Sequence, residues 1–152
     1  MIKKATRENL SDIILIENSC FKDPYKESDL IYELEENPVN EFLLLVEDDK
    51  VIGFIDYMVT FNSATITQIA VLPEYQRQGN GGKLLLEMFN RLPGIDDYEL
   101  GKEIVEFTTL EVRVGNLKAI SFYHKHGFED VTIKKHYYKD GKDALYMLKR
   151  MN

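Results

Sequence analysis

Three glycines lie in the segment Gln76 to Gly82, which follows a strand-like apolar run and precedes an amphipathic helix expected to begin near Lys83. Glycine lets the backbone turn with positive φ and approach a ligand closely, while N–H groups at a helix start point at one spot. The segment therefore predicts an anion site, with phosphate or pyrophosphate as its natural occupant. Such bends also occur without any ligand, so this segment alone leaves both interpretations open.

The segment lacks the two common nucleotide-binding patterns. A triphosphate-binding loop carries Lys and then Ser or Thr after its last glycine, whereas Lys83 is followed by Leu84. The dinucleotide pattern Gly-x-Gly-x-x-Gly fails because Gly79 and Gly81 have no glycine at position 84. What remains is Gln-x-x-Gly-x-Gly after a Val-Leu-Pro-Glu-Tyr bend.

This remaining pattern resembles the acetyl-CoA loop of the GNAT superfamily of N-acetyltransferases. A second segment, from Leu110 through Asn116 and Tyr123 to Phe128, resembles the second GNAT signature and is most similar to ribosomal-protein-alanine N-acetyltransferases of the RimI type. The resemblance implies acetyl-CoA as cosubstrate, no metal, and a CoA pyrophosphate on the glycine segment. It assigns CoA contacts to Ile69, Ala70, Val71, Gln76, Arg77, Gln78, Gly79, Asn80, Gly81, Gly82 and Asn116.

Glu111 is the candidate general base. An amino group is mostly protonated at neutral pH and must lose a proton before it attacks a thioester. Alternation in an otherwise apolar strand puts Leu110 and Val112 on the face opposite Glu111, and burial makes a carboxylate more basic. The RimI-type pattern Leu-Glu-Val-Arg matches at Leu110 to Arg113 and implies the same role. A strand glutamate paired with Lys or Arg is the alternative.

Tyr123 is the candidate general acid, because a phenol can pass its proton to a departing CoA thiolate, whose pKa resembles that of cysteine, about 8.5. The alternative is a tyrosine packed on the sheet beside Ala119 and Phe122. Asn116 is expected to cap the helix that carries Tyr123, and the resemblance also brings its side chain to the CoA arm. The resemblance further implies that the Val71 N–H faces the thioester oxygen.

The prediction of the acceptor site is based on looser matches to the RimI-type pattern. The resemblance includes a Tyr137-Tyr138 pair followed by a turn and Asp143-Ala144, and such a hairpin would line a groove for a peptide N-terminus. Phe21 and Tyr25, between the first two helices, would form the other wall. Packing within the hairpin and the loop is the alternative for all four aromatic residues. The segment Pro93 to Glu103 is longer than in typical RimI-type sequences, which would reshape the acceptor site.

The predicted function is acetyl transfer from acetyl-CoA to the α-amino group of a protein N-terminus, with the N-terminal alanine of a small-subunit ribosomal protein as the expected acceptor. The mechanism is direct attack, with Glu111 as base and Tyr123 as acid. Two alternatives stay open: acetylation of a small amine or a lysine side chain, and a non-catalytic CoA-binding module.

Apolar periodicity and turn residues predict the order β-α-α-β-β-β-α-β-α-β-β. The expected helices are Leu10 to Ser19, Lys26 to Glu36, Lys83 to Leu92 and Asn116 to His126, and the expected strands before the C-terminal hairpin are Ile2 to Thr6, Phe42 to Glu47, Val51 to Thr60, Ala64 to Leu72 and Ile104 to Val112. The fold class is α/β (α+β), similar to the GNAT fold. It has a mixed, mostly antiparallel sheet of six to seven strands and about four helices on both faces, in one domain over residues 1–152.

The amino-acid composition limits the kinds of molecule that the protein is expected to bind. A net charge of −7 argues against nucleic acid and suits a basic protein, since nucleic-acid binding needs clustered Lys and Arg. The apolar run Ile13 to Ile16 is too short to cross a membrane, so we expect no membrane association. Cys20 is the only cysteine, and its isolation agrees with a reducing cytoplasm. It is expected to pack in the core with Ile13 and Ile16, and a catalytic thiol is the alternative. We expect a monomer or a weak dimer.

Overall fold

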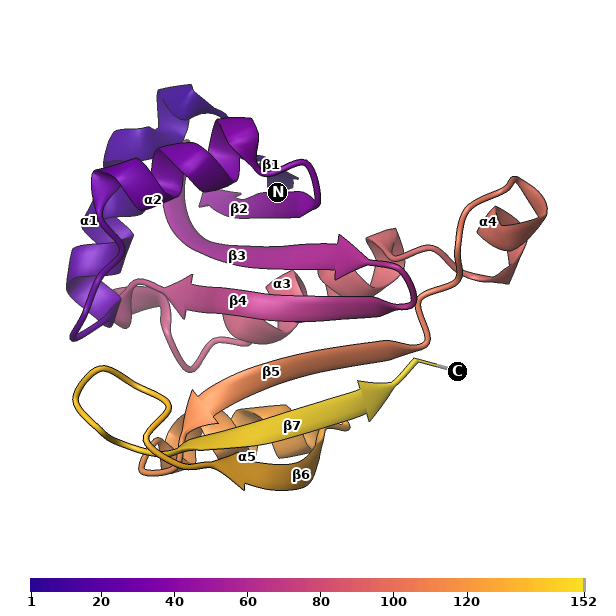
Figure 1. The fold of residues 1–152 in the computed structure, drawn as a ribbon. Coiled ribbons are helices and arrows are strands. Elements are labelled where there is room, and N and C mark those ends of the chain that lie inside the picture. The colour runs from indigo at the N-terminus through magenta and orange to yellow at the C-terminus, as the bar shows by residue number, and fades with distance from the viewer. Residues whose placement is uncertain (152) are drawn as a thin grey trace. The chain divides into compact units, whose positions relative to one another are not determined.

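The computed structural model describes residues 1–151 (Figure 1). The chain forms two compact units: the N-terminal unit comprises Met1–Val59 and Ile66–Leu92, and the C-terminal unit comprises Thr60–Thr65 and Pro93–Asn152. Strand β4, Ser63–Val71, begins in the C-terminal unit and ends in the N-terminal unit. No helix in the described part of the chain has the length and apolar character that a bilayer span requires.

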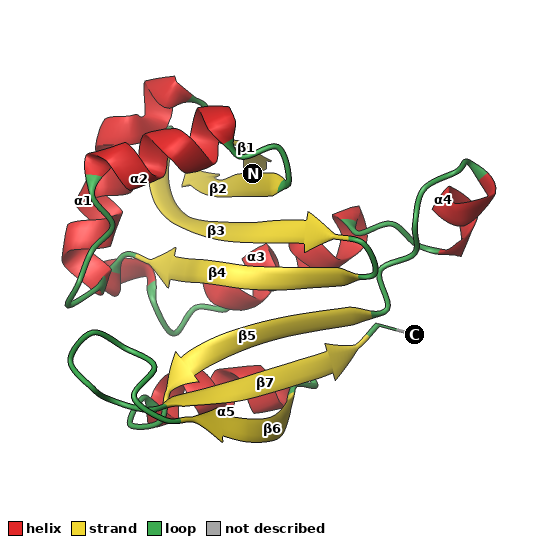
Figure 2. Ribbon diagram, viewed as in Figure 1, coloured by secondary structure: helices red, strands yellow, loops and turns green. Residues whose placement is uncertain are grey.

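The elements follow nearly the predicted order (Figure 2). The other strands are β1 Ile2–Lys4, β2 Asn40–Glu47, β3 Lys50–Thr60, β5 Phe107–Arg113, β6 Glu129–Lys134 and β7 Ala144–Arg150, and the helices are α1 Leu10–Cys20, α2 Glu27–Ile31, α3 Asn80–Arg91, α4 Ile95–Glu99 and α5 Leu117–Lys125. The strands are hydrogen-bonded in the order β1-β2-β3-β4-β5-β7-β6. β4 and β5 are parallel, whereas β1/β2, β2/β3, β5/β7 and β6/β7 are antiparallel. This mixed, mostly antiparallel sheet confirms the predicted fold class.

Alternating strand residues give the N-terminal unit a core on each face of its sheet. Phe42 and Phe54 pack with Ile13 and Ile16 of α1, and the two phenylalanine rings lie 5.1 Å apart. Leu43 is also fully buried, but strand alternation directs it to the opposite face. The apolar side of α3 supplies Leu84, Leu85 and Met88, each fully buried.

The turn between β2 and β3 explains how that hairpin closes. Asp48 and Asp49 both have positive φ, 50° and 63°, which is the backbone of a two-residue turn whose twist matches that of the flanking strands. Asp and Asn tolerate this conformation better than most residues that carry a Cβ. This turn joins the two strands predicted from Phe42 to Glu47 and from Val51 to Thr60 as a hairpin.

Two helix predictions need correction. The helix expected from Lys26 to Glu36 is α-helical only in α2 and continues as a π-helical segment over Tyr32–Glu36. The helix expected near Lys83 begins earlier, at Asn80, because Gly79 adopts a left-handed φ of 81° directly before it and the Asn80 side chain bonds back to the preceding turn. Gly81 and Gly82 consequently lie in the first helical turn rather than in a loop.

The C-terminal unit contains one helix that the sequence did not predict. Helix α4 lies inside the long Pro93 to Glu103 segment, where Asp97 Oδ2 accepts a hydrogen bond of 3.0 Å from the Gly94 N–H and closes a helix N-terminus. The strand expected from Ile104 starts only at Phe107. The Val105 N–H bonds to the Pro93 carbonyl at 3.0 Å, so the chain before Phe107 belongs to the loop.

Candidate active site

The start of α3 has the geometry of an anion site. The first helical hydrogen bond runs from the Lys83 N–H to the Gly79 carbonyl at 3.1 Å, so the helix itself offers no acceptor to the N–H groups of Asn80, Gly81 and Gly82. Asn80 is buried, and its Nδ2 donates to the Tyr75 carbonyl at 2.8 Å. That bond fixes the helix start against the turn before it, so the N–H groups point in a set direction.

Side chains that precede the helix hold the end of β4. Gln76 Nε2 donates to the Val71 carbonyl at 2.8 Å, and the thiol of Cys20 donates to the same oxygen at 3.3 Å. Gln78 Nε2 donates to the Glu74 carbonyl at 3.3 Å, whereas Arg77 is exposed with a positive φ of 62°. These amide side chains therefore hold the segment through bonds to its own main chain.

Cys20 is a packing residue, as predicted. It packs against the core of the N-terminal unit, and burial raises the pKa of its thiol. A thiol that keeps its proton is a poor nucleophile. The catalytic-thiol alternative therefore has no support in this environment.

The β4 residues predicted to contact CoA lie against the neighbouring strand β3, which approaches them closely. Ala70 and Val71 are buried, and Ile69 is half-buried. A Cβ atom built on Gly53 of β3 would lie 2.7 Å from the Ala70 carbonyl oxygen, so only glycine fits there. This close approach keeps the β4 main chain in place.

In the C-terminal unit, Glu111 lies opposite Tyr146 in the β5/β7 pair. Leu110 and Val112 are buried with 1% and 8% exposure, which confirms the predicted alternation. The Glu111 side chain keeps 19% exposure and accepts a hydrogen bond of 2.7 Å from Lys134 Nζ. The glutamate is thus sheltered and also ion-paired, so the pairing weighed as the alternative is present in this structure.

Aromatic rings surround this ion pair. Lys134 Nζ lies 4.5 Å from the centre of the Tyr146 ring and 5.6 Å from that of Tyr137. Tyr137 and Tyr138 pack edge to face at 5.0 Å, and the Arg113 guanidinium lies 4.1 Å from the Tyr138 ring centre. Lys134 therefore links the predicted base to Tyr137, and Tyr138 packs between Tyr137 and Arg113.

Arg113 has a second bond that orients it. Its Nη1 lies 2.9 Å from Asp140 Oδ2, on the turn between β6 and β7. Since β5 and this turn belong to different parts of the sequence, the ion pair ties the hairpin tip to the strand that carries Glu111. The tip is thus held beside the face where the candidate base lies.

Helix α5 positions the candidate acid. Asn116 Oδ1 accepts from the Ala119 N–H at 3.2 Å, which confirms the predicted cap, and Gly127 ends the helix with a φ of 92°. Tyr123 is 7% exposed and packs edge to face on Phe122 and Phe128. Burial raises the pKa of Tyr123, so its hydroxyl keeps its proton at neutral pH.

Phe21 and Tyr25 both pack against the core of the N-terminal unit, half-buried. The Tyr25 N–H donates to Glu17 Oε1 at 2.9 Å, and burial raises the pKa of the Tyr25 phenol. Glu17 is itself only 1% exposed and also accepts from Gln68 Nε2 at 3.2 Å. These contacts fix the α1 to α2 connection, which agrees with the packing interpretation of the two aromatic residues.

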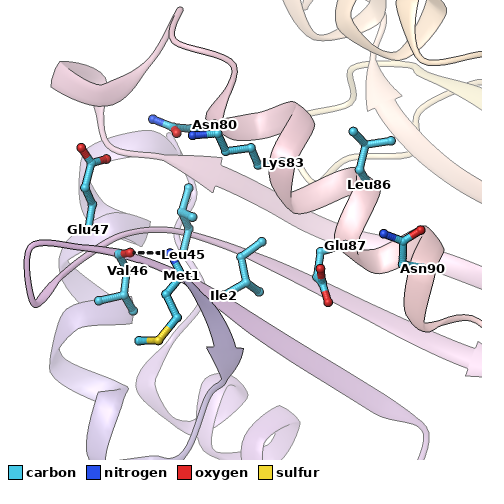
Figure 3. Close-up of a pocket in the computed structure, with 10 residues that line it drawn as sticks. All are labelled: Met1, Ile2, Leu45, Val46, Glu47, Asn80, Lys83, Leu86, Glu87 and Asn90. Atoms are coloured by element: carbon cyan, nitrogen blue, oxygen red, sulfur yellow. Dashed lines mark hydrogen bonds between the residues drawn. The ribbon is translucent and has the colours of Figure 1, made fainter.

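A pocket of about 550 Å³ lies elsewhere in the N-terminal unit, lined by parts of β1, β2 and α3 (Figure 3). The amino group of Met1 donates to the Val46 carbonyl at 3.0 Å on its wall. Asn80 is the one predicted site residue among those that line it. The pocket is therefore distinct from most of the predicted CoA contacts.

The sequence matches the family model of the acetyltransferase (GNAT) domain over residues 38–130, which is more than half of the chain. The chain belongs to the GNAT acetyltransferase family. It is accordingly an N-acetyltransferase of the GNAT type. The predicted family is confirmed.

Known proteins resemble this chain over nearly its full length. A Bacillus subtilis protein with the provisional name ribosomal protein bS18-alanine N-acetyltransferase is 32% identical over 152 residues, covering 99% of this chain and 95% of that protein. The crystal structure of the ribosomal-protein-S18-alanine N-acetyltransferase from Escherichia coli has a TM-score of 0.83 at 30% identity, covering 100% and 94% of the two chains. A GNAT acetyltransferase from Elizabethkingia anophelis with acetyl-CoA bound shares the fold, with a TM-score of 0.75 at 21% identity and coverage of 99% and 97%.

Three residues of interest were not predicted from the sequence. Lys134 and Tyr146 were missed because their approach to Glu111 depends on the pairing of three strands. Asp56 was missed although a charge between Ile55 and Tyr57 in an apolar strand was a visible signal. Among residues 1–151, no group of three or more His, Cys, Asp or Glu side chains is arranged to hold a metal ion.

Proposed function

We propose that this protein transfers the acetyl group of acetyl-CoA to the α-amino group of a protein N-terminus, and that its acceptor is the N-terminal alanine of a small-subunit ribosomal protein. The likeness to ribosomal-protein-alanine N-acetyltransferases over the full chain carries this proposal. A sheltered carboxylate beside tyrosine rings, on the strand with the Leu-Glu-Val-Arg pattern, adds chemical support. Because the family match over residues 38–130 includes parts of both compact units, we propose one catalytic domain.

The residues present fit acetyl-CoA at the start of α3. The N–H groups of Asn80, Gly81 and Gly82 would bind its pyrophosphate, helped by the positive end of the helix dipole. Gly79 permits the left-handed turn that brings these groups to the ligand. The main chain of Ile69 to Val71 would pair with the pantetheine amides like an added strand. Acetyl-CoA supplies the activated acetyl group.

Glu111 is the proposed general base. It accepts a proton from the acceptor ammonium, and the resulting amine attacks the thioester carbon. The C–N bond forms, the C–S bond breaks, and the nitrogen releases its second proton to solvent as the amide forms. Its partial shelter from water strengthens its interaction with a cationic amine. The Arg113 to Asp140 ion pair supports this face by holding the hairpin tip beside it.

Tyr123 is the proposed general acid for the departing sulfur. Its raised pKa means that the proton is present on the hydroxyl at neutral pH. Transfer from an ordinary phenol to a thiolate is already uphill by about 1.5 pKa units, or about 2 kcal/mol, and burial adds to that cost. Tyr123 therefore acts by a hydrogen bond that stabilises the developing thiolate and passes the proton as the sulfur leaves.

We propose the following for binding of the acceptor. Tyr137 and Tyr138 would contact the peptide, and Phe21 and Tyr25 are the further residues that we propose for acceptor binding. The net charge of −7 suits a basic substrate. We also propose a cytoplasmic location, because the bS18 protein named for the relatives is a ribosomal component. A monomer or weak dimer remains our proposal for the oligomeric state.

A thiol-release assay tests the function. Acetyl-CoA is supplied with a short arginine-containing peptide that has a free N-terminal alanine, beside the same peptide with a blocked N-terminus and an added lysine. Turnover only with the free alanine supports the proposal. Turnover with the blocked, lysine-containing peptide identifies a lysine acetyltransferase instead. Silence with both, despite acetyl-CoA binding, points to a small amine acceptor or to a binding module.

A further inference from the structure

The ion pair at Glu111 has the composition of a binding site for an alkylammonium group. Lys134 Nζ lies 2.7 Å from Glu111 Oε1, 4.5 Å from the Tyr146 ring centre and 5.6 Å from the Tyr137 ring centre. A carboxylate and aromatic faces are the two kinds of group that attract a cation most strongly in proteins. The protein thus shows, with its own side chain, that a primary ammonium fits against the candidate base.

Strand register explains why these groups meet on one face. Glu111 of β5 is paired with Tyr146 of β7, and Tyr146 is paired with Thr132 of β6. Lys134 follows Thr132 by two positions, so it projects from the same face, one step along the edge strand. Glu111, Tyr146 and Lys134 therefore meet across three paired strands, and of these three only the lysine comes from the edge strand.

Lys134 is the replaceable member of this group. It is the last residue of β6, which pairs with β7 alone and whose other residues are exposed. The Lys134 side chain is 41% exposed, whereas that of Glu111 is 19% exposed. The hydrogen bond to Glu111 raises the pKa of Lys134, so the occupant is a charged ammonium. An exposed ion pair of this kind is weak enough for another cation to compete with it.

We propose that Lys134 occupies the position of the acceptor's ammonium group, and that the acceptor amine binds by displacing it from Glu111 and the rings of Tyr146 and Tyr137. The proposal rests on the function proposed above, in which Glu111 is the base. The acceptor α-ammonium and the lysine ammonium carry the same charge and the same N–H donors, so each satisfies the carboxylate. Only a cationic amine can make this exchange, which gives Lys134 a role in acceptor selection.

The exchange involves no covalent step. Lys134 moves its ammonium into water, where its side chain is already partly exposed, and Glu111 keeps one cationic partner throughout. While Lys134 is bound to Oε1 of Glu111, an acceptor ammonium cannot take the same position, so the resident lysine competes with the substrate. Removing the lysine charge must then favour acceptor binding rather than impair it.

Kinetics of two substitutions test this competition. Lys134→Met removes the charge but retains an unbranched side chain, and we expect the KM for the alanine peptide to fall about two- to fivefold, the range that an exposed ion pair supplies. Lys134→Arg keeps the positive charge, and a guanidinium can bind a carboxylate through two N–H groups at once, so the KM is expected to rise. Lys135→Met, at the exposed neighbouring position, is the matched control and leaves the KM unchanged. A lower kcat or a higher KM in Lys134→Met would overturn the proposal, because it would mean that Lys134 positions Glu111.

A second measurement separates this inference from the proposed function, because it needs no turnover. The ¹⁵N resonance of the Lys134 ammonium is followed while alaninamide is added, and then while N-acetylalaninamide is added. Movement with alaninamide alone, absent in Glu111→Gln, supports displacement. Movement with both compounds, or with neither, contradicts it. If the peptide is not acetylated but the resonance responds to the free amine, the proposed function fails while the cation site stands.

Discussion

Asp56 makes the stability of this protein depend on pH in a direction that can be worked out. Its carboxyl group is fully buried on β3, where Asn40 Nδ2 donates to Oδ1, and Oδ2 has no hydrogen-bond partner among the described residues. Burial raises the pKa of Asp56 to about 8 from an ordinary value of 3.8, and the nearby charges of Glu33 and Glu17 add to the rise. The folded protein therefore holds a proton on Asp56 at pH values where the unfolded chain has lost it.

The direction of the pH dependence follows from the number of protons that the folded and unfolded states bind. Between about pH 4 and pH 8 the folded state binds more protons at Asp56 than the unfolded state does, so the free energy of unfolding falls as the pH rises. A full proton difference gives a slope of about 1.4 kcal/mol per pH unit, so the loss between pH 5 and pH 7 is about 3 kcal/mol from this group. For a chain of this size, that loss lowers the melting temperature by roughly 6 to 12 °C.

The perturbation is Asp56→Asn, whose amide has nearly the same shape and stays neutral. The free energy of unfolding is measured by urea titration at several pH values from 5 to 7 in both proteins. Glu17 and Glu33, whose pKa values are also raised by burial, remain in both, so the difference between the two slopes isolates Asp56. Asp12→Asn, at an exposed position of α1, is the control and should keep the wild-type slope. Parallel profiles for wild type and Asp56→Asn would show that Asp56 does not cause the pH dependence.

Three further predictions concern the catalytic proposal. Glu111→Gln should lower kcat about a hundredfold or more with little change in acetyl-CoA affinity, measured by steady-state kinetics and calorimetry, because it removes the base and leaves the anion site intact; an unchanged kcat would rule out Glu111 as the base. Tyr123→Phe keeps the aromatic packing, so thiol release should slow while the melting temperature stays within a few degrees, and an equal rate would leave Tyr123 with packing alone. Gly79→Ala puts a Cβ on a φ of 81°, so we expect about 1 to 3 kcal/mol of strain and weaker acetyl-CoA binding by calorimetry, with wild-type affinity as the contrary result.

Local signals predicted the fold well where one residue type decides the backbone. The Asp48-Asp49 turn, the Asn116 cap and the Gly127 helix end all lie where the sequence puts them. Helix α3 starts before its predicted residue because the Asn80 side chain bonds to the Tyr75 carbonyl in the turn just before it, which offsets the low helix propensity of two glycines. Helix α4 escaped prediction because a helix of one turn has no periodicity to detect.

The candidate site was predictable strand by strand, but its contacts were not. Alternation alone placed Glu111 on the face opposite Leu110, as observed. Its partner Lys134 depends on the register of the β6/β7 pair, which shifts between Asp130 and Thr132, and no local pattern fixes such a shift. The charge of a long side chain also says little about its partner, because lysine reaches several neighbours on a sheet face.

The acceptor that we propose is the α-amino group of an N-terminal alanine. The most direct test gives the enzyme acetyl-CoA and one arginine-containing peptide that carries both a free N-terminal alanine and an internal lysine, and then locates the acetyl group by tandem mass spectrometry. We predict one acetyl group on the N-terminal nitrogen and an unmodified lysine. Acetylation of the lysine, with the N-terminal nitrogen left free, would contradict the claim.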